Sequence, residues 1–222
     1  LCQIQQLSQL DWALEAGANV IIAQGSEAGG HGANSLEGRA TFTLVPEIAD
    51  YLAQQSPQTQ LLAAGGVADG RGLAAALSLG ADGVLIGSRL WASSESLAAP
   101  GAVASALAAS GDDTARSAVF DILRRKDWPA PYDFRALRNT LHRRWECRID
   151  DLRSYPQDAR ADYDAGVAAG DFSRAHATVG EAAGLIKDAP GAEELILRIT
   201  NDARSRLLRM SELLADQQVT CG

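Results

Sequence analysis

A glycine-rich segment that ends in a histidine has the residue types needed to exchange a proton beside a bound ligand. The segment reads Gln24-Gly-Ser-Glu-Ala-Gly-Gly-His31 and directly follows an apolar run. Glycine lets a backbone come close to a flat ligand, and imidazole gains and loses a proton near neutral pH. We therefore predict that His31 is catalytic, with a solvated loop histidine as the alternative. Glu27 could act as an acid or base, or it could orient the loop by accepting backbone hydrogen bonds.

Two further glycine clusters, Gly65-Gly66 and Gly87-Ser88, each follow an apolar run and are separated by one predicted helix and one predicted strand. In a parallel barrel, the loops after the last two strands commonly bind phosphate through exposed backbone N–H groups. Either cluster alone could be an ordinary turn, but two in consecutive units favour an anion site. We assign no catalytic role to Asp69 or Arg71, which could cap a helix or pair on the surface.

Other reactive side chains form no recognisable catalytic group. Ser26 and Ser88 have no evident histidine or aspartate partner in the sequence, which argues against a serine hydrolase. His142 and His176 lie in charged stretches that are predicted to be helical, so we expect them to be structural or surface residues.

The composition restricts the class of partner. The net charge of −8 over 222 residues argues against nucleic-acid binding, which requires a basic face. The three cysteines share no CxxC spacing, so we expect neither a disulfide framework nor a metal site. The apolar runs are far shorter than the ~20 residues that span a bilayer, and the first residues do not show the basic and then apolar pattern of a signal peptide. We expect a cytoplasmic protein with a small-molecule or protein partner and no membrane contact.

The elements that would position these residues are predicted from an internal repeat. Ala13–Gly25 and Ala76–Gly87 both read as a helix end, a glycine, an apolar run and a second glycine. Unbroken runs of Val, Ile and Leu are typical of parallel strands covered on both faces, and glycine can end a helix in the left-handed conformation. The pattern predicts parallel βα units. Strands are expected at 2–5, 20–23, 61–64 and 84–86, and helices at 7–16, 46–55, 70–79 and 95–110.

After Asp112-Asp113 the composition shifts towards arginine, aspartate and isolated tryptophans. We therefore divide the chain into a partial (β/α) barrel at residues 1–111 and a helical C-terminal extension at residues 112–222. Apolar residues at three- and four-residue spacing predict helices at Phe134–Arg148, Gly180–Lys187 and Ala192–Asp216.

Three motifs, in order, make this sequence similar to the nitronate monooxygenases, formerly called 2-nitropropane dioxygenases. They are Ala23–His31, Leu62–Gly72 and Gly80–Arg89, and the similarity continues through Arg135–Asn139 and Gly180–Ile186. The resemblance implies an α/β fold of the TIM-type barrel class that binds FMN non-covalently. It also implies the oxidation of an alkyl nitronate by O₂ to a carbonyl compound and nitrite.

The resemblance also implies roles for single residues. Gln24 and Gly29 would lie near the flavin, and the backbones of Gly66, Gly87 and Ser88 would hold its phosphate. His31 would hydrogen-bond the nitro oxygens of the substrate or, in some members, take a proton from carbon. The full set of predicted cofactor-binding residues is Gln24, Gly29, Gly30, Gly65, Gly66, Gly87 and Ser88.

The sequence departs from the family in places. Ser88 stands where relatives often have threonine, which preserves a hydroxyl, and Ala33 stands where many have glycine. Only the units that correspond to about strands five to eight of the barrel are predicted, which leaves two unpaired strand edges. We therefore expect a fragment that lacks the N-terminal half.

Two alternatives remain open. One is a flavin-dependent enzyme of the same superfamily that takes electrons from NAD(P)H, such as an enoyl-acyl-carrier-protein reductase or a quinone reductase. The other is a non-catalytic barrel remnant or interaction protein.

Overall fold

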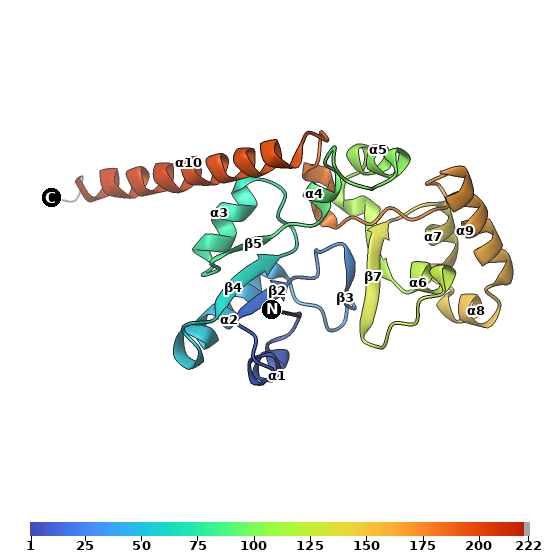
Figure 1. The fold of residues 1–222 in the computed structure, drawn as a ribbon, viewed down its shortest axis with the longest axis horizontal. Coiled ribbons are helices and arrows are strands. Elements are labelled where there is room, and N and C mark those ends of the chain that lie inside the picture. The colour runs from blue at the N-terminus through green and yellow to red at the C-terminus, as the bar shows by residue number, and fades with distance from the viewer. Residues whose placement is uncertain (220–222) are drawn as a thin grey trace.

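A four-stranded parallel sheet lies at the centre of the N-terminal part of the chain (Figure 1). The computed structural model describes residues 1–219, with side chains up to residue 214. The sheet order is β1-β2-β4-β5, and every neighbouring pair is parallel. The strands are β1 (Cys2–Ile4), β2 (Val20–Gln24), β4 (Gln60–Ala64) and β5 (Gly83–Leu85). Spatial order follows sequence order, as in part of a (β/α) barrel.

One helix crosses between each pair of neighbouring strands in this sheet. A short 3₁₀ turn η1 (Leu7–Gln9) leads into α1 (Leu10–Glu15), and α2 (Thr41–Gln55) and α3 (Gly70–Ser78) follow. These elements lie close to their predicted ranges. The predicted N-cap of α3 is also found, because the Asp69 carboxylate accepts hydrogen bonds from the N–H groups of Arg71 and Gly72. The core between sheet and helices contains the fully buried side chains Ile4, Leu10, Ile21, Leu44, Ile48 and Leu61.

Helix α2 begins at Thr41, five residues before the predicted start at Pro46. Proline favours the first turn of a helix, but Pro46 lies inside α2, after its first turn. The first turn of α2 is stabilised by a residue 14 positions earlier in the sequence, because the Glu27 carboxylate accepts hydrogen bonds from the N–H and hydroxyl of Thr41.

A second, antiparallel sheet of three strands lies beside the first. Its order is β3-β7-β6, with β3 (Gly30–Ala33), β6 (Thr114–Ser117) and β7 (Tyr132–Leu137). The predicted helix over 134–148 is therefore wrong at its start, and only α7 (Thr140–Trp145) is helical there. In β7, Phe134 and Ala136 are buried while Arg135 between them is half-buried, which is the two-residue period of a strand.

Residues 112–219 thus mix strands with helices, so the predicted purely helical extension is wrong in this respect. The helices that complete the chain, with their 3₁₀ turns, are α4 (Ser88–Trp91), α5 (Pro100–Ala108), η2 (Gly111–Asp113), α6 (Val119–Arg124), α8 (Ile149–Ser154), α9 (Gln157–Ala169), η3 (Glu181–Leu185) and α10 (Ala192–Val219). A second core lies among α6, β7, α7, α8 and α9, around Phe120, Leu123, Leu141 and Leu152. Because β7 pairs with β3, the two predicted parts of the chain share one sheet.

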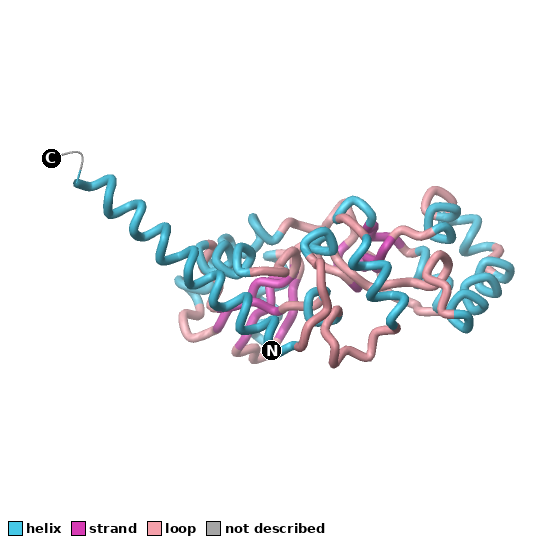
Figure 2. Tube along the Cα trace, turned by 90° about the horizontal axis from the view of Figure 1, so that it is seen from above, coloured by secondary structure: helices cyan, strands magenta, loops and turns pink. Residues whose placement is uncertain are grey.

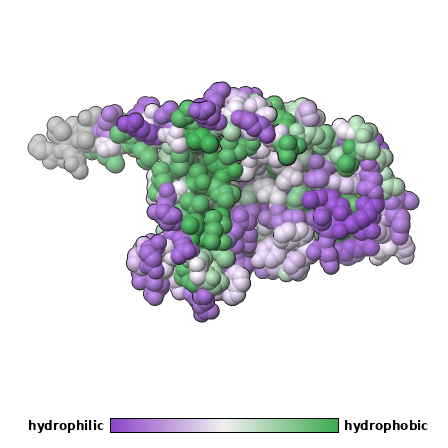
Figure 3. Space-filling view, in the orientation of Figure 1, coloured by the Kyte–Doolittle hydropathy of each residue, from purple (hydrophilic) through white to green (hydrophobic). Residues whose placement is uncertain are grey.

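The longest helix, α10, packs on α3 and then extends beyond the rest of the molecule (Figures 1 and 2). Figure 3 shows an apolar strip where α3 and β5 lie, and Leu77 and Leu85 are exposed on these elements. No helix within residues 1–219 is both long enough and apolar enough to cross a membrane.

Candidate active site

A cavity of about 430 Å³ lies at the carboxyl ends of the parallel strands. Its volume is within the ~300–1,000 Å³ range of ligand pockets. Seven of the eight predicted site residues line it, namely Gln24, Gly29, His31, Gly65, Gly66, Gly87 and Ser88. Gly30 is the exception and does not line the cavity. The opposite wall comes from a segment far away in the sequence, through Thr178, Gly180 and Ala182.

Part of the cavity wall is backbone with unused hydrogen-bond donors. Within residues 1–219, the N–H groups of Gly66, Gly87 and Ser88 donate to no acceptor. A Cβ on Gly87 would meet no atom within 4 Å, and a Cβ on Gly66 would meet only Glu27, at 3.9 Å. Unused N–H groups beside open space suit an anion. Among the described residues no lysine or arginine lines the cavity, so a phosphate there would be bound by uncharged donors such as these N–H groups.

The amide of Gln24 connects the strand ends to the histidine segment. Its Oε1 accepts hydrogen bonds from the side-chain amides of Gln3 and Gln5, each at 2.6 Å, and its Nε2 donates to the carbonyl of His31 at 3.0 Å. A carbonyl only accepts, which fixes the orientation of this amide. One N–H of Gln24 remains for a ligand.

His31 lies in β3, directly opposite Phe134 of β7, rather than in a loop. Its Nε2 is 2.9 and 3.0 Å from the two carboxylate oxygens of Asp121. Its ring stacks on Trp128 with 3.7 Å between the ring centroids. The side chain is only 16% exposed, so the alternative of a solvated loop histidine does not hold.

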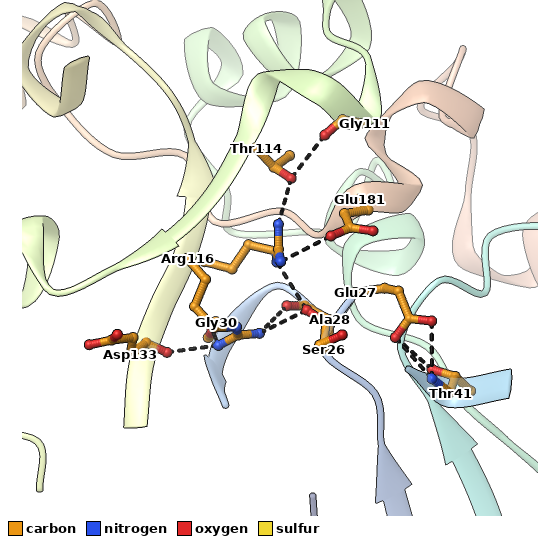
Figure 4. A network of polar contacts seen from close by, with 11 residues as sticks. Ser26, Glu27, Ala28, Gly30, Thr41, Gly111, Thr114, Arg116, Asp133 and Glu181 are labelled. Carbon is orange, nitrogen blue, oxygen red and sulfur yellow. Dashed lines mark hydrogen bonds and ion pairs between the residues drawn. The ribbon is translucent and has the colours of Figure 1, made fainter. Parts of the chain in front are cut away.

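The glycine-rich segment is clamped by the guanidinium of Arg116 (Figure 4). Nη1 donates to the carbonyl of Gly30 at 3.0 Å and to that of Asp133 at 2.7 Å, and Nη2 donates to the carbonyl of Ala28 at 2.7 Å. Burial, with Arg135 nearby, lowers the pKa of Arg116 to about 10, so the group is charged at neutral pH. Sequence analysis did not identify Arg116, because nothing in its local pattern indicates a contact 86 residues away.

Arg135 also holds the same segment, as does Glu27, which Figure 4 shows beside Thr41. Arg135 donates from Nε to the carbonyl of Ser26 at 3.1 Å and pairs with Glu181 at 3.0 Å. The Glu27 carboxylate accepts from Thr41, as described above. Of the two interpretations of Glu27, orienting the loop is the one that this geometry supports.

The distant wall is docked onto the segment by backbone hydrogen bonds. The N–H of Gly180 donates to Oγ of Ser88 at 2.9 Å, and the N–H of Glu181 donates to the carbonyl of Glu27 at 2.9 Å. The sequence predicted a helix at Gly180–Lys187 and a family resemblance at Gly180–Ile186, but neither placed this stretch at the cavity.

The other two histidines do not line the cavity. His142 is 1% exposed and lies 2.8 Å from Oγ of Ser117, and burial lowers its pKa. Nδ1 of His176 and the hydroxyl of Tyr163 form a hydrogen bond at 2.7 Å, and burial lowers the pKa of His176 to about 4. Both lie in the second core. Within residues 1–219, no three His, Cys, Asp or Glu side chains are grouped so that they could hold a metal ion.

Comparison with known proteins gives one family. The family model described as nitronate monooxygenase matches residues 2–202. The nitronate monooxygenase npaC of Metarhizium robertsii is 36% identical over 212 residues, which cover 91% of this chain and 58% of that protein. The nitronate monooxygenase of Neurospora crassa is 33% identical over 206 residues, which cover 90% of this chain and 52% of that protein. The chain thus spans little more than half the length of these relatives.

Solved structures share the fold. FabK from Thermotoga maritima superposes with a TM-score of 0.76 at 28% identity, covering 95% of this chain and 62% of that one. The nitroalkane oxidase of Streptomyces ansochromogenes superposes with a TM-score of 0.73 at 24% identity, covering 92% of this chain and 58% of that one. These likenesses confirm the predicted TIM-type α/β class, present here as part of a barrel.

Proposed function

The chain belongs to the nitronate monooxygenase family, and we propose that it binds FMN and oxidises alkyl nitronates with O₂ to a carbonyl compound and nitrite. The observation that carries this proposal is the cavity itself. Three unused N–H groups, the Gln24 amide and His31 line one space. A ligand with a phosphate and a flat polar ring system matches that arrangement.

The residues present fit FMN. The N–H groups of Gly66, Gly87 and Ser88 would hold the phosphate, and a glycine at 66 and 87 leaves the room that a Cβ would fill. The remaining N–H of Gln24 and the backbone of Gly29 would lie along the ring system. When bound, FMN would supply the redox chemistry between the substrate and O₂.

The protein would supply orientation, a dry site and a proton site. The wall formed by Thr178, Gly180 and Ala182 would keep water from the reacting atoms. His31 would bind the nitro oxygens of the substrate or accept a proton from its carbon. We also propose a cytoplasmic location, because Cys2 and Cys147 are free thiols.

A test of this function starts from the purified 222-residue chain. We expect a yellow protein that releases FMN on denaturation, identified by chromatography against FMN and FAD standards, and that forms nitrite from propyl nitronate in air. A protein that takes up no flavin would contradict the proposal and favour the barrel remnant. Rapid anaerobic bleaching by NAD(P)H, without bleaching by propyl nitronate, would instead favour the reductase alternative.

A further inference from the structure

The carboxylate of Asp121 faces the ring of His31 from α6, ninety residues further along the chain. Both carboxylate oxygens lie within 3.0 Å of Nε2. Asp121 does not line the cavity that His31 lines. The residue therefore contacts the histidine without contacting the space where a substrate would sit.

His31 is the partner that accounts for the burial of Asp121. The residue is 5% exposed, and a buried carboxylate costs several kcal/mol unless it is paired. Within the described residues, the ring of His31 supplies the only hydrogen bond to the Asp121 carboxylate. Arg124 is the next cation, with Nη1 at 4.0 Å from Oδ1, which is beyond hydrogen-bond distance.

The pairing determines which ring nitrogen is free. An ionised carboxylate only accepts hydrogen bonds, so Nε2 of His31 carries a proton. In the neutral ring, Nδ1 is then the unprotonated nitrogen. The stack on Trp128 and the tilted contact with Phe134, at 4.9 Å between ring centroids, hold the plane of the ring.

We propose that Asp121 is a positioning residue for His31: it holds the ring in the Nε2–H tautomer, so that Nδ1 is the proton acceptor of the active site. The role of His31 in turnover rests on the proposed function above, whereas the tautomer does not. Asp121 acts only through His31.

The tautomer can be measured directly in the flavin-free chain. Long-range ¹H–¹⁵N NMR spectra at pH 8 distinguish the two neutral tautomers, and the chain has only three histidines, so His31→Asn assigns the His31 signals. We expect the Nε2–H form in the wild type and a mixture of both forms in Asp121→Leu. Asp121→Glu should restore the Nε2–H form. The signals of the buried His142 and the half-buried His176 report whether each variant is folded.

A matched control removes a carboxylate that does not touch the histidine. Asp164 pairs with Arg125 on the surface at 2.7 Å, and Asp164→Leu should leave the His31 signals unchanged. A wild-type His31 in the Nδ1–H form would overturn the proposal, even if Asp121→Leu failed to fold. An unchanged tautomer in a folded Asp121→Leu would overturn it as well.

Turnover provides the second readout. In the FMN-loaded chain, Asp121→Leu should lower kcat with propyl nitronate by ~10²-fold, a typical contribution of a positioned acid–base group, with FMN binding and KM nearly unchanged. Equal kcat in the two proteins would contradict the positioning role. If the wild type has no such activity, the proposed function fails, while the NMR result still decides the role of Asp121.

Discussion

Gly29 and Gly180 pack backbone against backbone, although 151 residues separate them. A Cβ on Gly29 would come within 2.6 Å of the Gly180 nitrogen, and a Cβ on Gly180 would come within 2.6 Å of the Gly29 nitrogen. Real Cβ atoms do not approach other atoms so closely, so both positions require glycine. The contact joins the histidine segment to the distant wall of the cavity.

Gly29→Ala should therefore separate the two walls. The methyl group would meet backbone atoms of Val179 and Gly180, and overpacking of this kind typically costs ~1–3 kcal/mol. We expect a lower midpoint in urea denaturation and weaker FMN binding in a fluorescence titration. A variant with wild-type stability would show that the two segments are not in contact.

Gly87→Ala should weaken FMN binding without lowering the stability of the flavin-free protein. Gly87 has φ −95°, which L-residues adopt freely, and a Cβ there meets no protein atom within 4 Å. The flavin-free protein should keep its stability, while the affinity for FMN falls by ~10-fold or more because the methyl occupies the phosphate space. An FMN affinity equal to that of the wild type would show that Gly87 is not part of the phosphate site.

Arg116→Lys should loosen the histidine segment. Hydrogen bonds from a charged donor contribute ~1.5–3 kcal/mol, and lysine cannot reach the carbonyls of Ala28 and Gly30 together. We expect a fall of ~1–3 kcal/mol in the free energy of unfolding. In the control Arg125→Lys, which alters an exposed ion pair with Asp164, the loss should stay below ~1 kcal/mol. Equal losses in the two variants would contradict a clamping role for Arg116.

His176 should make the fold sensitive to mild acid. Burial lowers its pKa from 6.5 to about 4, so between these values the unfolded chain binds a proton that the folded chain does not. Stability should be full above about pH 6.5 and fall by up to ~3 kcal/mol as the pH drops to about 4.

Urea denaturation of the wild type and of His176→Gln, at about pH 7 and about pH 4.5, isolates this contribution from that of His142. The variant should lose less stability than the wild type between the two pH values. An identical pH dependence would show that His176 is not buried in its neutral form.

The parallel sheet and most of its site residues could be predicted because they depend on local patterns. Apolar runs ending in glycine indicated β2, β4 and β5, and the residues that follow these strands necessarily meet at one edge of a parallel sheet. For the same reason, the sequence alone was enough to predict that Gly66, Gly87 and Ser88 lie together.

The second sheet could not be predicted in the same way. The stretch from Phe134 to Leu137 has a spacing that fits a helix as well as a strand, and pairing with β3 decides between them. Asp121 and Arg116 act on the histidine segment through contacts about 90 residues apart in sequence. No local signal encodes such contacts, so the pairing of His31 and its clamp are visible only in the folded chain.

The most direct test of the proposed function is the anaerobic reduction of the bound flavin, followed by absorbance in a stopped-flow instrument. Propyl nitronate should bleach the flavin of the wild type, and admission of O₂ should restore the colour and form nitrite. The same mixing with His31→Asn should bleach the flavin ~10²-fold more slowly at equal FMN occupancy. A wild-type flavin that stays oxidised in the presence of the nitronate would contradict the account.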